Sequence, residues 1–387
     1  MALPESRLPN EVWGQILENV WEYDKSTLKS FSLTCRAFCG ISRPRLFSKI
    51  RFIPYATIKG ALLLPSPTAV NACIERLDFL CSNGIAPLVR QCHIFPHKSY
   101  YDDTEWSFST DTPYLLLDAL FERLSRFTGL QRLDVFRIPL TQSRVDILFH
   151  LPHLSELHVS TCTVTPGDPI ALSLKALQLS DFELCHDSEL EHGADYWIPL
   201  LHPGHLRTLK TAFVPRFMHH AVHTIPSFPN VHTLKAIIHD TISSQNLTIK
   251  FPGVRVFKLW GKGLNIEADA GRVTVVFPHL EEYYGPYEAL PLFLTSTLTR
   301  IQTECPSPED FLTRIQVIHG DKITSLNAKF EAFDNTAFDD IVKLLPHLRE
   351  LLLWQRRVSC SVEQRAADDP CDLTDPRCRK QCGTPDT

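Results

Sequence analysis

Short apolar segments recur along most of this chain in a single frame. An apolar residue is followed by a second one three positions later and by a third one two positions after that. The segment LSELHV shows the frame with Leu154, Leu157 and Val159. Alternating apolar positions predict a strand with one buried face. The other copies begin at Val89, Leu130, Leu174, Leu206, Val231, Val254, Leu280, Leu298, Ile323 and Leu348.

From Leu130 onwards, most copies begin about 25 residues after the start of the previous copy. Steps of roughly 20 to 29 residues, each with one strand and a return segment, are typical of leucine-rich repeats. Return segments such as 113–127 and 337–346 have helical apolar spacing. Only the copy from Leu154 carries the full consensus, which ends at Cys162. The pattern resembles the irregular leucine-rich repeats of F-box proteins, and a sandwich would not explain steps of such similar length.

A different, helical pattern occupies the first 50 residues. In LPNEVWGQILENV, residues 8–20, Pro9 suits a first helical position and apolar residues then recur at helical spacing. A second helix is predicted in STLKSFSLTCRAF, where Ser26 or Thr27 can cap it. We expect the third helix to be broken near Pro44, since proline removes a helical hydrogen bond.

So small a helical module is predicted to be marginal alone, so it either caps the domain behind it or binds a partner. The order of Leu-Pro at 8–9 and LTCRAF at 33–38 resembles the F-box, especially the divergent F-boxes that precede repeat domains in fungal proteins. F-boxes dock on the Skp-type adaptor of cullin–RING ubiquitin ligases. The resemblance implies that the adaptor interface and the small core comprise Leu8, Pro9, Val12, Ile16, Leu17, Leu28 and Cys35.

The predicted fold is α/β: an N-terminal three-helix F-box followed by a right-handed α/β leucine-rich-repeat solenoid with irregular repeats. The box is placed at 1–50, a linker helix region at 51–85, the solenoid at 86–357 and a flexible, Cys-containing tail at 358–387. Residues 96–112, which are polar, aromatic and acidic, are predicted to form an insertion. Long loops of this kind are usually functional or disordered.

Composition narrows the classes of partner. The net charge of -5 gives no footprint for nucleic acid, and no apolar stretch approaches the roughly 20 residues of a membrane span. The N-terminus also lacks the apolar region of a secretory signal. The 12 cysteines are therefore expected to be reduced thiols in a cytoplasmic or nuclear protein.

Strand alternation also predicts which residues are exposed. The third, fifth and seventh residues of each copy should share the concave face. Lys210, Lys235 and Lys258 are fifth residues of successive copies, so they should form a row. Either these lysines simply extend into water, or they bind an acidic or phosphorylated protein segment. The predicted substrate-binding residues are Lys210, Lys235, Ile237, Lys258, Trp260 and Tyr284.

No catalytic residue, metal site or cofactor is predicted. The segment HHAVH at 219–223 lacks the two-histidine-plus-glutamate pattern of metalloproteases, and the group at 185–192 lies in a predicted loop. In the tail, only Cys378 and Cys382 approach the spacing of a zinc pair. No phosphate-binding glycine loop or nucleophile elbow is present in the sequence.

The resemblance implies a non-catalytic substrate-recognition subunit of an SCF-type cullin–RING ubiquitin ligase. The box would bind the Skp-type adaptor and the repeats would bind an unknown protein substrate, so that proximity accelerates ubiquitin transfer. The alternative is a leucine-rich-repeat scaffold or interaction protein that acts outside a ubiquitin ligase. Neither a nucleic acid nor a membrane is expected as a partner.

Overall fold

The structure is a computed structural model that divides into two compact units, Met1–Glu282 and Tyr283–Thr387. We call them the first and the second unit. The residues it describes are 12–13, 15–16, 25–58, 61–98, 106–108, 114–165, 177–185, 196–211, 226–237, 242–260, 266–267, 276–315, 322–331 and 335–355.

Eight neighbouring strands form the framework of the first unit. They are β1 (Lys49–Phe52), β4 (Gln91–Ile94), β7 (Arg132–Phe136), β9 (Glu156–Ser160), β11 (Asp181–Cys185), β12 (Thr208–Thr211), β13 (Thr233–Ile237) and β15 (Val256–Trp260). Each strand pairs in parallel with the next one in this order. These strands belong to a 12-stranded sheet whose order continues through β17, β18, β19 and β20.

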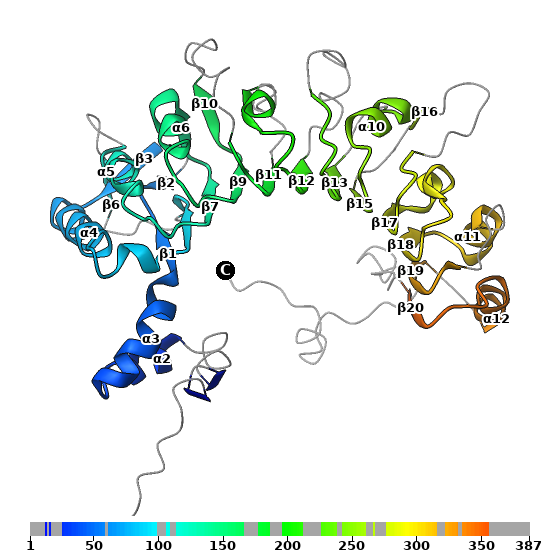
Figure 1. Cartoon of the computed structure of the whole chain (residues 1–387), viewed down its shortest axis with the longest axis horizontal. Helices are drawn as coiled ribbons and strands as arrows, with labels where there is room; N and C mark the ends of the chain where they lie inside the picture. The colour runs from blue at the N-terminus through cyan, green and yellow to red at the C-terminus, as the bar shows by residue number, and fades with distance from the viewer. Residues whose placement is uncertain are drawn as a thin grey trace, which may run out of the picture. The chain divides into compact units, whose positions relative to one another are not determined.

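Helices cover one face of these strands. The helices that follow strands of the first unit include α4 (Pro67–Leu80), α5 (Leu115–Leu124), α6 (Gln142–Leu148) and α10 (Ser244–Lys250). Figure 1 shows α5, α6 and α10 on one side of the strands. Alternate strand residues such as Leu133 and Leu157 are fully buried, as are Leu116 and Leu120 of α5. The apolar core therefore lies between the strands and the helices. The residues described on the other strand face, which we call the open face, are partly exposed.

Smaller sheets accompany the main strands of the first unit. The strands β2 (Ala56–Ile58), β3 (Ala61–Pro65), β5 (His97–Lys98) and β6 (Trp106–Phe108) form a mixed sheet in the order β5-β2-β3-β6. Two parallel pairs are β8 (Pro139–Thr141) with β10 (Thr163–Thr165), and β14 (Ile242–Ser243) with β16 (Ile266–Glu267). Short 3-10 turns lie at η1 (Ala86–Leu88) and η2 (Ile198–Leu200).

At the N-terminal end of the first unit, the described residues 12–13 and 15–16 are helical, and two longer helices follow before β1. They are α2 (Lys25–Ser32) and α3 (Arg36–Ser48), and they pack against each other. The predicted break at Pro44 is wrong, because α3 continues through this proline to Ser48. Phe47, in the last turn of α3, packs against Phe79 of α4 with ring centroids 5.8 Å apart. This tertiary contact holds the turn that follows the proline, and the sequence pattern alone does not show it.

The second unit has the same alternation of strands and helices. Its elements are β17 (Glu282–Pro286), η3 (Tyr287–Phe293), β18 (Arg300–Cys305), α11 (Pro308–Ile315), β19 (Ser325–Phe330), α12 (Asn335–Leu344) and β20 (Glu350–Gln355). The strands β18, β19 and β20 pair in parallel. In β20, Leu352 and Trp354 are more than half exposed, and the Trp354 indole donates to Asn327 at 3.1 Å. No helix in the described parts of either unit is long and apolar enough to cross a membrane.

The predicted architecture, a three-helix F-box followed by a leucine-rich-repeat solenoid, is wrong. The fold is α/β with a 12-stranded sheet, and its first strand begins at Lys49, directly after α3. The predicted boundary at residue 50 therefore falls within a strand. The segment 51–85 holds β2 and β3 as well as helix α4. In β1 only Ile50 and Phe52 carry the buried alternation, and so short a pattern is not recognisable in the sequence.

The structure also places the predicted insertion, whereas the predicted tail cannot be compared with it. The insertion at 96–112 contributes β5 and β6 to the mixed sheet, where β6 pairs antiparallel with β3. The tail at 358–387 lies outside the described residues.

Two glycines of the first unit sit where successive turns of the chain come close together. A Cβ atom at Gly253 would lie 2.2 Å from the carbonyl oxygen of Pro229, and one at Gly129 would lie 2.2 Å from that of Pro87. A main-chain carbonyl cannot move away as a flexible side chain can. The close approach of successive turns at these two positions therefore requires glycine, which has no side chain.

We expect the substitution Gly253→Ala to lower the free energy of unfolding by about 1–3 kcal/mol, the range for overpacking a tight contact. Gly40→Ala in α3 is the matched control, because its Cβ would meet nothing within 4 Å. Alanine there should be neutral or stabilising by about 0.5–1 kcal/mol through its helix propensity. Urea unfolding of both variants measures the difference, and equal midpoints would show that the turn at Gly253 has room for a side chain.

Candidate functional site

A row of ionisable side chains crosses the open face of the first unit. One residue from each of the eight strands contributes, and the pairing register aligns them. We call this set the charged row: Arg51, His93, Asp134, His158, Glu183, Lys210, Lys235 and Lys258. Neighbouring strands lie about 4.8 Å apart, and aligned residues point to the same face. Each group in the row therefore faces the group on the next strand.

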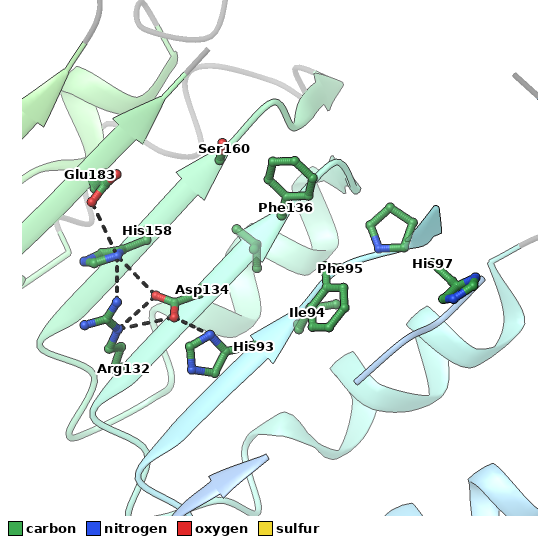
Figure 2. Close-up of a pocket in the computed structure, with 12 residues that line it drawn as sticks. His93, Ile94, Phe95, His97, Arg132, Asp134, Phe136, His158, Ser160 and Glu183 are labelled. Atoms are coloured by element: carbon green, nitrogen blue, oxygen red, sulfur yellow. Dashed lines mark hydrogen bonds and ion pairs between the residues drawn. The ribbon is translucent and has the colours of Figure 1, made fainter. Parts of the chain in front are cut away.

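Asp134 of β7 contacts three side chains on the open face. The Nδ1 atom of His93 lies 2.6 Å from its Oδ2 atom, and the Nε atom of Arg132 donates to its Oδ1 atom at 3.0 Å. On the opposite side, the Nδ1 atom of His158 lies 3.2 Å from Oδ1. Figure 2 shows the carboxylate between these three side chains. Asp134 thus links β4, β7 and β9.

The ionisation of Asp134 follows from these contacts. Burial of the side chain acts to raise the pKa of Asp134. Hydrogen bonds from His93 and Arg132, together with the charges of these two groups, outweigh burial and hold the pKa below the ordinary value for aspartate. Asp134 is therefore a fixed negative charge in the row.

His158 lies between carboxylates on both sides. Its Nε2 atom is 3.6 Å from Asp181, and its Nδ1 atom is 3.6 Å from the Oε2 atom of Glu183. Arg132 also approaches this Nδ1 atom at 3.2 Å, so the proton position depends on the tautomer. His158 thus lies within 3.6 Å of the carboxylates of Asp134, Asp181 and Glu183.

Glu183 marks a change of charge along the row. Its Oε1 atom accepts a short hydrogen bond from the ammonium group of Lys210 on the next strand. Beyond Lys210, the register places Lys235 and then Lys258 in the next two positions. The predicted lysine row is thus present, but its first member is paired with a carboxylate that the sequence reading did not place there.

The lysine end of the row has no acidic residue on its own strands. The segments of β12, β13 and β15 read TLKT, TLKAI and VFKLW. Ile237 and Trp260 are in register two positions after the lysines of their strands. Ile237 is half-buried and Trp260 is 45% exposed. Three cationic side chains therefore lie next to an exposed indole on one face.

A pocket of about 670 Å³ opens over the other end of the row. The charged row contributes His93, Asp134, His158 and Glu183 to it. The remaining lining residues are Ile94, Phe95, Pro96, His97, Arg132, Val135, Phe136 and Ser160. Figure 2 shows the rings of Phe95 and Phe136 beside the charged groups. The pocket thus combines an aromatic wall with a polar floor.

The remaining predicted binding residues do not belong to the charged row. Tyr284 is half-buried in β17 of the second unit. Among the predicted adaptor-binding residues, Leu28 is fully buried, Val12 is half-buried, and Ile16 and Cys35 are exposed. Leu8, Pro9 and Leu17 lie outside the described residues.

Three members of the row, Arg51, His93 and Glu183, were missed by the sequence reading. His93 is the fifth residue of the copy from Val89, which can be read directly from the sequence. Glu183 was missed because the frame from Leu174 is out of register with β11, whose buried residues are Phe182 and Leu184. The correct frame begins at Leu179, 25 residues after Leu154 instead of the 20 that Leu174 gives. The irregular step was therefore a usable signal.

The contacts described on this face join charged or ionisable side chains. His158 has carboxylates near both ring nitrogens, and no contact joins it to the pocket residue Ser160. Within the described ranges, no group of three or more His, Cys, Asp or Glu residues is placed to hold a metal ion. The histidines at 219–223 and the cysteines of the tail lie outside those ranges.

The lowered pKa of Asp134 predicts how stability depends on pH. A group whose pKa is depressed by folding stabilises the fold above its unfolded pKa, about 3.9 for aspartate, and loses this contribution as the pH falls through the folded value. We expect the urea midpoint of the wild type to fall more steeply below about pH 4 than that of Asp134→Asn. Asp340→Asn, at an exposed position in α12, should follow the wild type. Parallel pH curves for Asp134→Asn and the wild type would contradict the prediction.

Comparison with protein-family models and with curated proteins finds no match for this chain.

Proposed function

We propose that this chain is a protein-recognition subunit that binds an acidic segment of a partner protein on its open sheet face. The observation that carries the proposal is the in-register set of Lys210, Lys235 and Lys258 beside the exposed Trp260. We further propose that the N-terminal helices dock a Skp-type adaptor. The chain would then act in the cytoplasm or nucleus as a substrate-recognition subunit of a cullin–RING ubiquitin ligase.

The lysines favour an acidic partner because they stand next to one another on adjacent strands. Like charges directly opposite each other in a sheet are destabilising. A partner segment with carboxylates or phosphates would relieve this repulsion. The relief of repulsion between the lysines would then contribute to the free energy of binding. The carboxylate of Glu183 pairs with Lys210, the first of the three.

Trp260 adds an apolar contact to this charged surface. Its indole is 45% exposed, and Ile237 on the adjacent strand lies in register with it. Exposed tryptophans are frequent among the residues that dominate binding energy at protein interfaces. An acidic segment crossing the lysines would therefore bury apolar surface as well as pair its charges.

Adaptor docking is supported by the helices α2 and α3. Trp13, Phe31 and Phe38 form a small aromatic cluster with centroid distances of 4.8–6.0 Å. In the turn between the helices, Leu33 is 80% exposed. An apolar side chain presented to this extent suits docking into a partner groove. Leu33 belongs to the LTCRAF segment on which the resemblance to the F-box rests.

We expect the triple variant Lys210→Glu, Lys235→Glu, Lys258→Glu to lose binding to a fluorescent acidic peptide. The corresponding triple variant Lys322→Glu, Lys343→Glu, Arg349→Glu in the second unit makes the same change in net charge and should retain binding. Wild-type binding should weaken with rising salt, because exposed charges are screened. Fluorescence anisotropy of acidic, phosphorylated and basic peptides measures this. Equal affinities of the two triple variants would refute the lysine site.

The adaptor proposal predicts that the wild-type chain forms a stable complex with a purified Skp-type adaptor in size-exclusion chromatography. Leu33→Glu should abolish this complex, because it places a charge in the apolar contact. Val342→Glu, which changes an exposed apolar residue of α12, should leave it intact. If the wild type itself forms no complex, the ligase assignment fails and an interaction protein acting outside a ligase is favoured.

A further inference from the structure

We infer that the acidic segment of the partner carries an aromatic residue that enters the pocket lined by Phe95 and Phe136. This inference rests on the proposed function and adds a second contact point to it. The pocket and the lysines adjoin along the same charged row, in the same unit, because Glu183 lines the pocket and pairs with Lys210 on the next strand. A single extended segment that crosses the strands would pass over both.

The walls of the pocket favour an aromatic side chain. Phe136 is 38% exposed, and Phe95, Pro96 and His97 are half-buried around the same space. Aromatic rings pair favourably in edge-to-face or offset arrangements beyond the area they bury. Figure 2 shows Phe95 and Phe136 on the same side of the strands as the charged groups. An aromatic ring of the partner would thus contact Phe95 and Phe136 from the same face of the sheet that carries the charged row.

The polar floor of the pocket argues against a basic side chain as the occupant. Asp134 already accepts hydrogen bonds from His93 and Arg132, and Glu183 accepts one from Lys210. An incoming arginine or lysine would compete with these internal partners for the carboxylate oxygens. The ring of Phe136 is likewise already in contact with a cation, since the Arg137 guanidinium carbon lies 4.9 Å from its centroid. The pocket therefore offers new apolar contacts more readily than new ion pairs.

The spacing of the strands fixes the spacing of the two contacts on the partner. Three strand steps separate β7, at the pocket, from β12, which carries Lys210. At about 4.8 Å per step they span about 14 Å, which an extended chain covers in about four residues. The lysines continue over two further steps, or about three residues of the partner. The partner segment should thus carry an aromatic residue about four to seven positions from its acidic residues.

Panning of a displayed library of random peptides, about twelve residues long and hence able to span both sites, tests this inference on the full chain. Peptides enriched by the wild type should combine an aromatic residue with acidic residues at the stated spacing. Phe136→Asp should abolish the aromatic preference but retain the acidic one, because it removes a pocket wall and leaves the lysines in place. Phe338→Asp, at an exposed position in α12, is the matched control and should enrich the wild-type pattern.

The outcomes separate this inference from the proposed function. Acidic peptides without an aromatic residue at fixed spacing would overturn the inference and leave the lysine site standing. An aromatic preference that persists in Phe136→Asp would also overturn it. Failure to enrich any acidic peptide that depends on Lys235 and Lys258 would overturn both. A basic residue enriched at the pocket position would show that the internal ion pairs give way and would reject the aromatic occupant.

Discussion

Parallel pairing in register determines both the core and the candidate site of this protein. Because each strand of the first unit meets the next one at equivalent positions, apolar residues such as Leu133 and Leu157 align on the helix side. The same register aligns Asp134 with His158 on the open side. A shift of one residue would exchange these two faces and bury the charged groups. The charged row is thus a consequence of the pairing that buries the core.

The sequence predicted the faces of the strands better than the architecture. Alternation placed Lys210, Lys235 and Lys258 on a common face, because side-chain direction in a strand depends only on local geometry. Whether the N-terminal helices form a separate module is decided by tertiary contacts. The four residues of β1 and the packing of Phe47 on Phe79 join these helices to the sheet, and no periodic pattern carries that information.

The candidate site was predictable only in part, for a related reason. Its lysines occupy the fifth position of copies whose apolar spacing is regular, so they could be placed from the sequence. Its other half depends on Glu183, in a copy whose frame is less regular, and on Phe95 and His97, which follow β4 where the alternation ends. The pocket also needs the chain to leave the sheet there and enter the mixed sheet through β5. Such a change of direction is set by packing and not by propensity.

The alternation within each strand has a consequence for how such a protein can diverge. In β13, Leu234 and Ala236 are fully buried, whereas Lys235 between them lies on the open face. A change at Lys235 alters what the surface attracts without opening a cavity beneath it. In β13, core packing and surface charge are therefore carried by residues that alternate along the same strand. New binding preferences can arise one side chain at a time on an unchanged scaffold.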